Sequence, residues 1–158
     1  MDFWMLSRDT LSNDLMDIFS ALHDIQYQCD WVVSDMNLYF SPDAPDEVRK
    51  RWSWTGLLMT GQELTKHLIS GYVFFAFGGI LSTVPKGTRL RQVWNYVPCW
   101  EIENFGSPDY HFQTPLKQLE IVCYDGYAWC IICEPEMSPD ILKVLPQVKT
   151  PDDFYNEL

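Results

Sequence analysis

The segment 119–133 constrains the fold of this chain most strongly. Two apolar runs rich in β-branched and aromatic residues, 119–124 and 127–133, flank the pair Asp125-Gly126. An Asp-Gly pair between such runs is typical of a type I′ hairpin turn, because both central residues of that turn need a positive φ. The sequence therefore predicts an antiparallel strand pair joined by a two-residue turn.

The rest of the chain predicts three helices and further strands. Helical spacing of apolar residues and capping residues indicate helices over 12–23, 62–69 and 138–145, with Thr60 and Ser138 as N-caps. Strands are expected at 30–33 and 37–40 (a hairpin turned by Ser34-Asp35-Met36), 52–59, 72–81 and 92–103, and a last helical turn at 151–155. We predict one α+β domain, 1–158. It has a mostly antiparallel sheet of about five to seven strands, an N-terminal helix, a short middle helix and a C-terminal helix, with the helices on one face.

Length and composition set the protein class. The chain has 158 residues with 47% hydrophobic and 15% aromatic content, which is enough for a packed core. Its first residues lack the pattern of a signal peptide, and its longest apolar run, 72–81, is about half of a membrane span. Five cysteines, an odd number, are typical of free thiols in a reducing compartment. We therefore expect a cytoplasmic protein that does not bind a membrane.

The charges of the sequence fall in three blocks. Residues 1–47 carry a net charge of −9, residues 48–100 carry +6 and residues 101–158 carry −8, which gives −11 in total. Acidic surfaces attract basic partners and repel nucleic acid. The loop 41–46, with two prolines, is the most exposed acidic segment that the sequence predicts. This pattern favours a basic protein as the partner and disfavours direct nucleic-acid binding.

No motif in the sequence predicts catalysis, a metal or a cofactor. Cys130 and Cys133 have C-x-x-C spacing, but they lie in a predicted strand, where residues three apart point to opposite faces. The histidines are scattered, and neither a G-x-S-x-G nor a glycine-rich phosphate loop is present. We predict that the protein is not an enzyme and that both cysteines belong to the core.

Two alternative sites remain open at this point. The first is a small-ligand pocket or enzyme site lined by aromatic residues, namely Trp94, Tyr96, Trp100, Tyr110 and His111. The second is the basic cluster Arg49-Lys50-Arg51 beside Trp52 and Trp54, because interleaved basic and aromatic residues can hold single-stranded nucleic acid. Against the second, the same bases can pair with the protein's own acids.

In size, acidity, inferred compartment and aromatic-plus-acidic composition, the chain resembles bacterial immunity proteins of contact-dependent growth inhibition and other polymorphic toxin systems. The resemblance spans the whole chain and implies a protein that blocks the active site of a cognate toxin domain, often a basic nuclease. We expect a monomer without a cofactor. The resemblance also implies that carboxylates meet the basic residues of the toxin and that two tryptophans, on one face of a predicted strand, anchor the interface. These partner-binding residues are Asp35, Asp43, Asp46, Glu47, Trp52 and Trp54.

Overall fold

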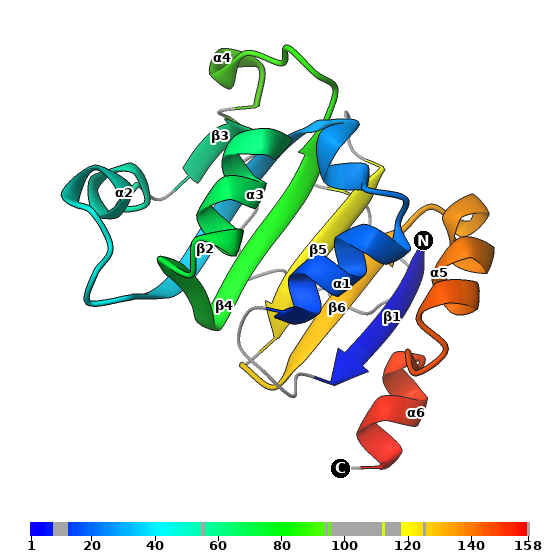
Figure 1. The fold of residues 1–158 in the computed structure, drawn as a ribbon. Helices are drawn as coiled ribbons and strands as arrows, with labels where there is room; N and C mark the ends of the chain where they lie inside the picture. The colour runs from blue at the N-terminus through cyan, green and yellow to red at the C-terminus, as the bar shows by residue number, and fades with distance from the viewer. Residues whose placement is uncertain are drawn as a thin grey trace.

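A computed structural model of the chain describes residues 1–7, 13–54, 56–93, 95, 112, 118–124 and 126–157. Its centre is a six-stranded antiparallel sheet with the strand order β1-β6-β5-β4-β2-β3 (Figure 1). The strands are β1 Asp2–Ser7, β2 Asp30–Phe40, β3 Gly56–Thr60, β4 Val73–Val84, β5 Leu119–Tyr124 and β6 Ala128–Cys133. The predicted α+β class with an antiparallel sheet is confirmed.

Helices lie at the beginning, middle and end of the chain, as predicted. They are α1 Asn13–Ala21, α2 Asp46–Arg51, α3 Gly61–Ile69, α4 Leu90–Val93, α5 Ser138–Val144 and α6 Pro151–Asn156, with short 3-10 helices η1 Ile25–Tyr27 and η3 Pro135–Met137. The Thr60 hydroxyl accepts a hydrogen bond from the Glu63 backbone N–H, which confirms the predicted cap of α3. Ser138 is not a cap: it lies inside α5, and its hydroxyl accepts a hydrogen bond from Trp4 and donates one to Asp2.

The main core lies between one face of the sheet and helices α1, α3 and α5. Ile18 and Phe19 of α1, Leu64 of α3 and Ile141 of α5 are buried against Trp31 and other strand residues. The apolar stripe that predicted the first helix is therefore the stripe that packs on the sheet.

The second face of the sheet is also buried, which the prediction of helices on one face did not include. Met5, Val122 and Cys130 form a second cluster with Phe154 of α6, and Val93 of α4 packs against Val32 and Val84. The reason is visible in β6, where every residue is buried. A strand that is apolar at every position must be covered on both faces.

The predicted hairpin at 30–40 is wrong, because these residues form the single strand β2. Ser34 pairs with Ile80 and Asn37 pairs with Gly78, so β2 has one extra residue here and Asp35 takes a φ of 48°. The polar step that resembled a turn is therefore a β-bulge.

Two other predicted strands need correction, and one strand was not predicted. The strand expected at 52–59 begins only at Gly56, because Trp52 ends helix α2. The strand expected at 92–103 is wrong at Gln92 and Val93, which belong to α4, and all but one of its other residues lie outside the described part of the chain. Strand β1, which sequence reasoning missed, forms one edge of the sheet.

The hairpin of β5 and β6 is confirmed, but its loop differs from the prediction. Tyr124 pairs with Ala128, so three residues rather than two join the strands, and Gly126 has a φ of 76°. In β6, Cys130 and Cys133 belong to clusters on opposite faces of the sheet, which confirms them as core cysteines.

Candidate functional site

The site predicted from the acidic loop lies on and before helix α2, which stands apart from the sheet at the left of Figure 1. Asp43, Asp46 and Glu47, which we call the acidic cluster, are all exposed. Asp46 and Glu47 occupy the first turn of α2, where the positive end of the helix dipole favours carboxylates. Among the described residues, none makes an ion pair with these three side chains. The acidic cluster is therefore open to a partner.

Arg49 fixes the loop that carries the acidic cluster. Its Nη2 donates to the carbonyl oxygens of Ser41 at 2.6 Å and Pro42 at 3.3 Å, and its Nε donates to the carbonyl oxygen of Ala44 at 3.1 Å. Its guanidinium also lies 5.4 Å from the centre of the Phe40 ring. Arg49 thus holds the backbone on both sides of Asp43 in one conformation.

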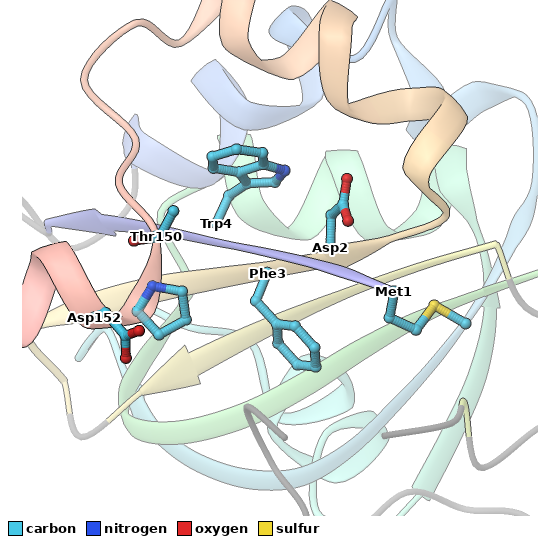
Figure 2. A pocket seen from close by; sticks show the side chains of 7 residues that line it. Met1, Asp2, Phe3, Trp4, Thr150 and Asp152 are labelled. Atoms are coloured by element: carbon cyan, nitrogen blue, oxygen red, sulfur yellow. The ribbon is translucent and has the colours of Figure 1, made fainter. Parts of the chain in front are cut away.

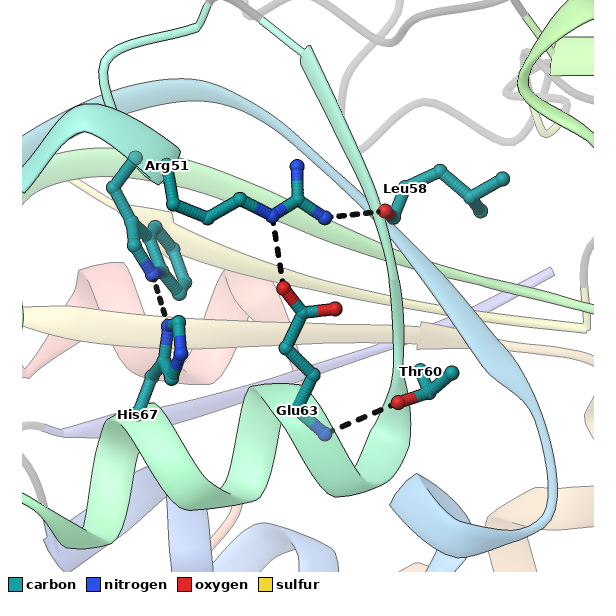
Figure 3. A network of polar contacts seen from close by, with 6 residues as sticks. Arg51, Leu58, Thr60, Glu63 and His67 are labelled. Carbon is teal, nitrogen blue, oxygen red and sulfur yellow. Dashed lines mark hydrogen bonds and ion pairs between the residues drawn. The ribbon is translucent and has the colours of Figure 1, made fainter. Parts of the chain in front are cut away.

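Arg51 ties the end of α2 to strand β3 and helix α3, as Figure 3 shows. Its Nε lies 2.8 Å from Oε1 of Glu63, and its Nη2 donates to the carbonyl oxygen of Leu58 at 2.7 Å. Strand β3 is the other edge of the sheet, so Arg51 occupies a backbone acceptor on that edge. Arg49 and Arg51 thus bind backbone carbonyls of the protein itself, and this weakens the nucleic-acid alternative. The third base, Lys50, is exposed.

The two tryptophans of the predicted site lie in different environments. Trp52 is only 3% exposed, packs against Phe75 and donates from Nε1 to Nδ1 of His67 at 2.5 Å. Trp54 is 63% exposed. The prediction that both share one face of a strand is wrong, because the chain between them leaves a helix and has not yet entered β3. Trp54 can serve as an anchor for a partner, whereas Trp52 positions α2.

The state of His67 follows from this contact. Burial lowers the pKa of His67; the neighbouring Glu63 raises it, and Lys66 and Arg51 lower it. Because Nδ1 accepts the hydrogen bond from the indole of Trp52, the imidazole is neutral with its proton on Nε2. Protonation at Nδ1 would remove the acceptor.

Asp35, the remaining predicted site residue, lies in a different element from the acidic cluster. It is exposed in the bulge of β2, beside Gly78 of β4, and its φ of 48° is unusual for a residue other than glycine. The structure thus keeps Asp43, Asp46 and Glu47 in one segment and assigns Asp35 to the middle of the β2–β4 pair.

Two of the cavities that the described residues line are relevant to small-ligand binding. One, of about 240 Å³, lies where β1 meets the start of α6 (Figure 2). Asp2 and Trp4 point to one side of β1 and Phe3 to the other, so its polar groups do not converge. The second, of about 360 Å³, lies at the start of α3, where Thr60, Gln62, Lys86 and Asp30 line it. The carboxylate of Asp30 is engaged there by the backbone N–H of Gly87.

Sequence reasoning missed one buried carboxylate. Glu120 of β5 is 1% exposed and accepts a hydrogen bond at 3.0 Å from the hydroxyl of Ser82 on the adjacent strand. The only sequence signal is an acid within an otherwise apolar strand. Within the described residues, no three His, Cys, Asp or Glu side chains group as metal ligands.

The predicted aromatic pocket lies outside the described residues, since Trp94, Tyr96, Trp100, Tyr110 and His111 all belong to the segments that the structure leaves out. Comparison with known proteins found no matching family model, no matching curated protein and no matching solved structure. None of the helices in the described part of the chain combines the length and apolar character that a membrane span requires.

Proposed function

We propose that the protein is an immunity protein, which binds a cognate basic toxin domain and neutralises it by covering its active site. The observation that carries the proposal is the exposed acidic cluster on a segment that the protein's own bases hold in place. Asp43, Asp46 and Glu47 are the groups that would meet the lysines and arginines with which a nuclease binds phosphates. The resemblance in size, charge and composition supports the same proposal.

Because the acidic segment has one fixed conformation, we expect it to bind a partner more tightly than a flexible acidic loop would. When a partner binds flexible carboxylates, it must order them, and the free energy that this ordering costs lowers the affinity. Here Arg49 and Arg51 have already ordered the backbone around the acidic cluster. Long-range attraction then speeds association, and the exposed ring of Trp54 supplies apolar contact area that slows dissociation. Inhibition in this scheme is steric and requires no chemistry.

The first experiment is capture of the partner. The tagged protein is used as bait in a lysate of the source organism at low and at high salt, and captured proteins are identified and assayed for nuclease activity. We expect one basic toxin domain that binds more strongly at low salt and whose activity the bait suppresses. If no protein binds and a small molecule co-purifies instead, the immunity proposal fails and the aromatic-pocket alternative takes its place.

Kinetics with the captured toxin then test the site. The variant Asp43→Asn, Asp46→Asn, Glu47→Gln should slow association by about tenfold or more at low salt. A control with the same charge change at exposed positions elsewhere, Asp17→Asn, Glu136→Gln, Asp140→Asn, should slow it about twofold at most. Trp54→Ala should instead speed dissociation. Equal slowing by the two triple variants would rule out α2 as the binding element.

A further inference from the structure

A second bulge, on β4, exposes an aromatic side chain. Leu38 pairs with Phe75 and Asn37 pairs with Gly78, so Ala76 and Phe77 are extra residues of β4. Bulges of this kind redirect side chains out of the regular alternation of a strand. Phe77 is consequently 58% exposed, although it lies in a strand whose neighbouring residues Phe75 and Ala76 are buried.

The β5–β6 hairpin loop packs directly on this bulge. A β-carbon placed on Gly126 would lie 2.6 Å from the carbonyl oxygen of Ala76 and 3.2 Å from Cδ1 of Phe77. Gly126 also has a positive φ of 76°. A glycine is thus required both by the turn and by the contact that brings the loop beside Phe77.

The aromatic surface continues from the loop to helix α6. The Tyr127 ring lies 6.2 Å from that of Phe154 and nearly parallel to it, and Tyr124 contacts both Tyr127 and Tyr155 edge to face. Tyr127 is 37% exposed and Tyr155 is 46% exposed. The hairpin loop and α6 lie toward the same end of the sheet in Figure 1. We call Phe77, Tyr127 and Tyr155 the aromatic surface.

Acidic residues border the aromatic surface. Asp152 and Asp153 are exposed on α6, directly before Phe154 and Tyr155, and one carboxylate oxygen of Asp153 accepts a hydrogen bond from the Thr150 hydroxyl. The nearby Lys149 is paired with Glu157. A surface of exposed rings beside carboxylates complements a cation with a flat, weakly hydrated face. That description fits the guanidinium of arginine, which stacks on rings while it pairs with acids, better than the strongly hydrated ammonium of lysine.

We infer that the aromatic surface is a second docking surface, which binds arginine side chains of the basic partner protein. The inference rests on the proposed function for the identity of that partner, but the preference for arginine over lysine is a property of the aromatic surface alone. A second copy of this chain is a poor occupant, because each copy carries a net charge of −11. The two docking surfaces would have different roles in binding the partner. The acidic cluster would attract any cation, and the aromatic surface would select arginine.

The test uses oligoarginine and oligolysine peptides of equal length, titrated at low salt into the full-length protein and followed by NMR of the aromatic side chains. We expect the arginine peptide to bind at least about fivefold more tightly than the lysine peptide and to shift the signals of Phe77, Tyr127 and Tyr155. In Phe77→Ser the ratio of the two affinities should fall toward one. Phe77→Ser changes an exposed side chain, and a backbone amide spectrum verifies that the variant is folded.

The acidic-cluster variant Asp43→Asn, Asp46→Asn, Glu47→Gln is the matched control. It should weaken the binding of both peptides and leave their ratio unchanged. A ratio of one in the unaltered protein, or a ratio that Phe77→Ser does not change, overturns the inference. Either result leaves the proposed function standing, because that proposal fails only if the protein captures and inhibits no basic toxin domain.

Discussion

The indole nitrogen of Trp52 donates a hydrogen bond to Nδ1 of His67 across 2.5 Å, and this contact joins the end of α2 to the last turn of α3. Trp52 is almost completely buried, so its N–H has no access to solvent when the contact is lost. The C-terminal end of α2 is therefore held by a hydrogen bond whose acceptor can titrate. His67 thus affects both the stability of the fold and the dependence of that stability on pH.

The first consequence concerns stability at neutral pH. In His67→Leu the buried N–H of Trp52 loses its acceptor, and we expect the free energy of unfolding to fall by about 1–3 kcal/mol. His67→Asn is the matched control, since its amide oxygen can occupy nearly the position of Nδ1. Urea unfolding of both variants gives the comparison. If the leucine variant is as stable as the asparagine variant, the hydrogen bond does not stabilise the fold.

The second consequence concerns pH. Because burial lowers the pKa of His67 in the folded state below the ordinary 6.5, the unfolded state binds the extra proton first. Stability from this group is thus complete above pH 6.5 and declines as the pH falls below that value. Carboxylates also titrate in acid, so the test is the difference between the unaltered protein and His67→Asn. That difference should shrink or reverse in sign as the pH is lowered from 7.5 to about 5. A difference independent of pH would contradict the assigned protonation state.

Arg51 contacts two separate groups, the Glu63 carboxylate and the Leu58 carbonyl, whose contributions to stability can be measured separately. Its contacts with Glu63 and with the Leu58 carbonyl are partly exposed, so we expect Arg51→Met to cost about 1–2 kcal/mol and the Arg51–Glu63 pair alone to contribute less than about 1 kcal/mol. A double-mutant cycle with Glu63→Gln, measured by chemical unfolding, separates the two contributions. A coupling energy near the full cost of Arg51→Met would mean that the bond to β3 contributes nothing.

The thiols of the described cysteines should be unreactive in the folded protein. Burial raises the pKa of Cys29 to about 12, with a further contribution from Asp30, and burial raises the pKa of Cys133 to about 11. Cys123 and Cys130 are fully buried. In a Cys99→Ser variant, which removes the cysteine outside the described residues, we expect no rapid reaction with a thiol reagent near pH 8 and complete reaction in denaturant. One rapidly reacting thiol in the native protein would contradict this packing.

Strand β2 shows that a polar step in a sequence can indicate two different structures. A polar step between two β-rich runs predicts a turn, as at Ser34-Asp35-Met36, but it also suits a bulge. The choice depends on the neighbours: β2 lies between β3 and β4 and keeps its pairing with β4 through the step. The amino-acid sequence of 30–40 does not indicate which strands lie beside it. The β5–β6 hairpin was predictable because its turn residues and its strands carry the signal in one continuous segment.

Helix α2 was missed for a similar reason. Six residues are too few for a clear helical periodicity, and a helix this short depends on contacts outside itself. Those contacts are long-range ones, from Arg51 to Glu63 and from Trp52 to His67. The sequence could therefore predict the acidic cluster and its exposure, but not that Trp52 supports it from within the core while Trp54 stays outside.

Comparison of Gly126 with Gly87 separates the cost of backbone strain from the cost of a steric contact. Gly126 and Gly87 have nearly the same positive φ, 76° and 78°, but a β-carbon on Gly87 would meet nothing within 4 Å, whereas one on Gly126 would meet the Ala76 carbonyl at 2.6 Å. We expect Gly87→Ala to cost about 1 kcal/mol from backbone strain alone and Gly126→Ala to cost about 2–4 kcal/mol. Unfolding experiments on both variants measure the difference, which reports the contact between the hairpin loop and the β4 bulge. Equal costs would mean that the hairpin loop does not press on the β4 bulge at Ala76 and Phe77.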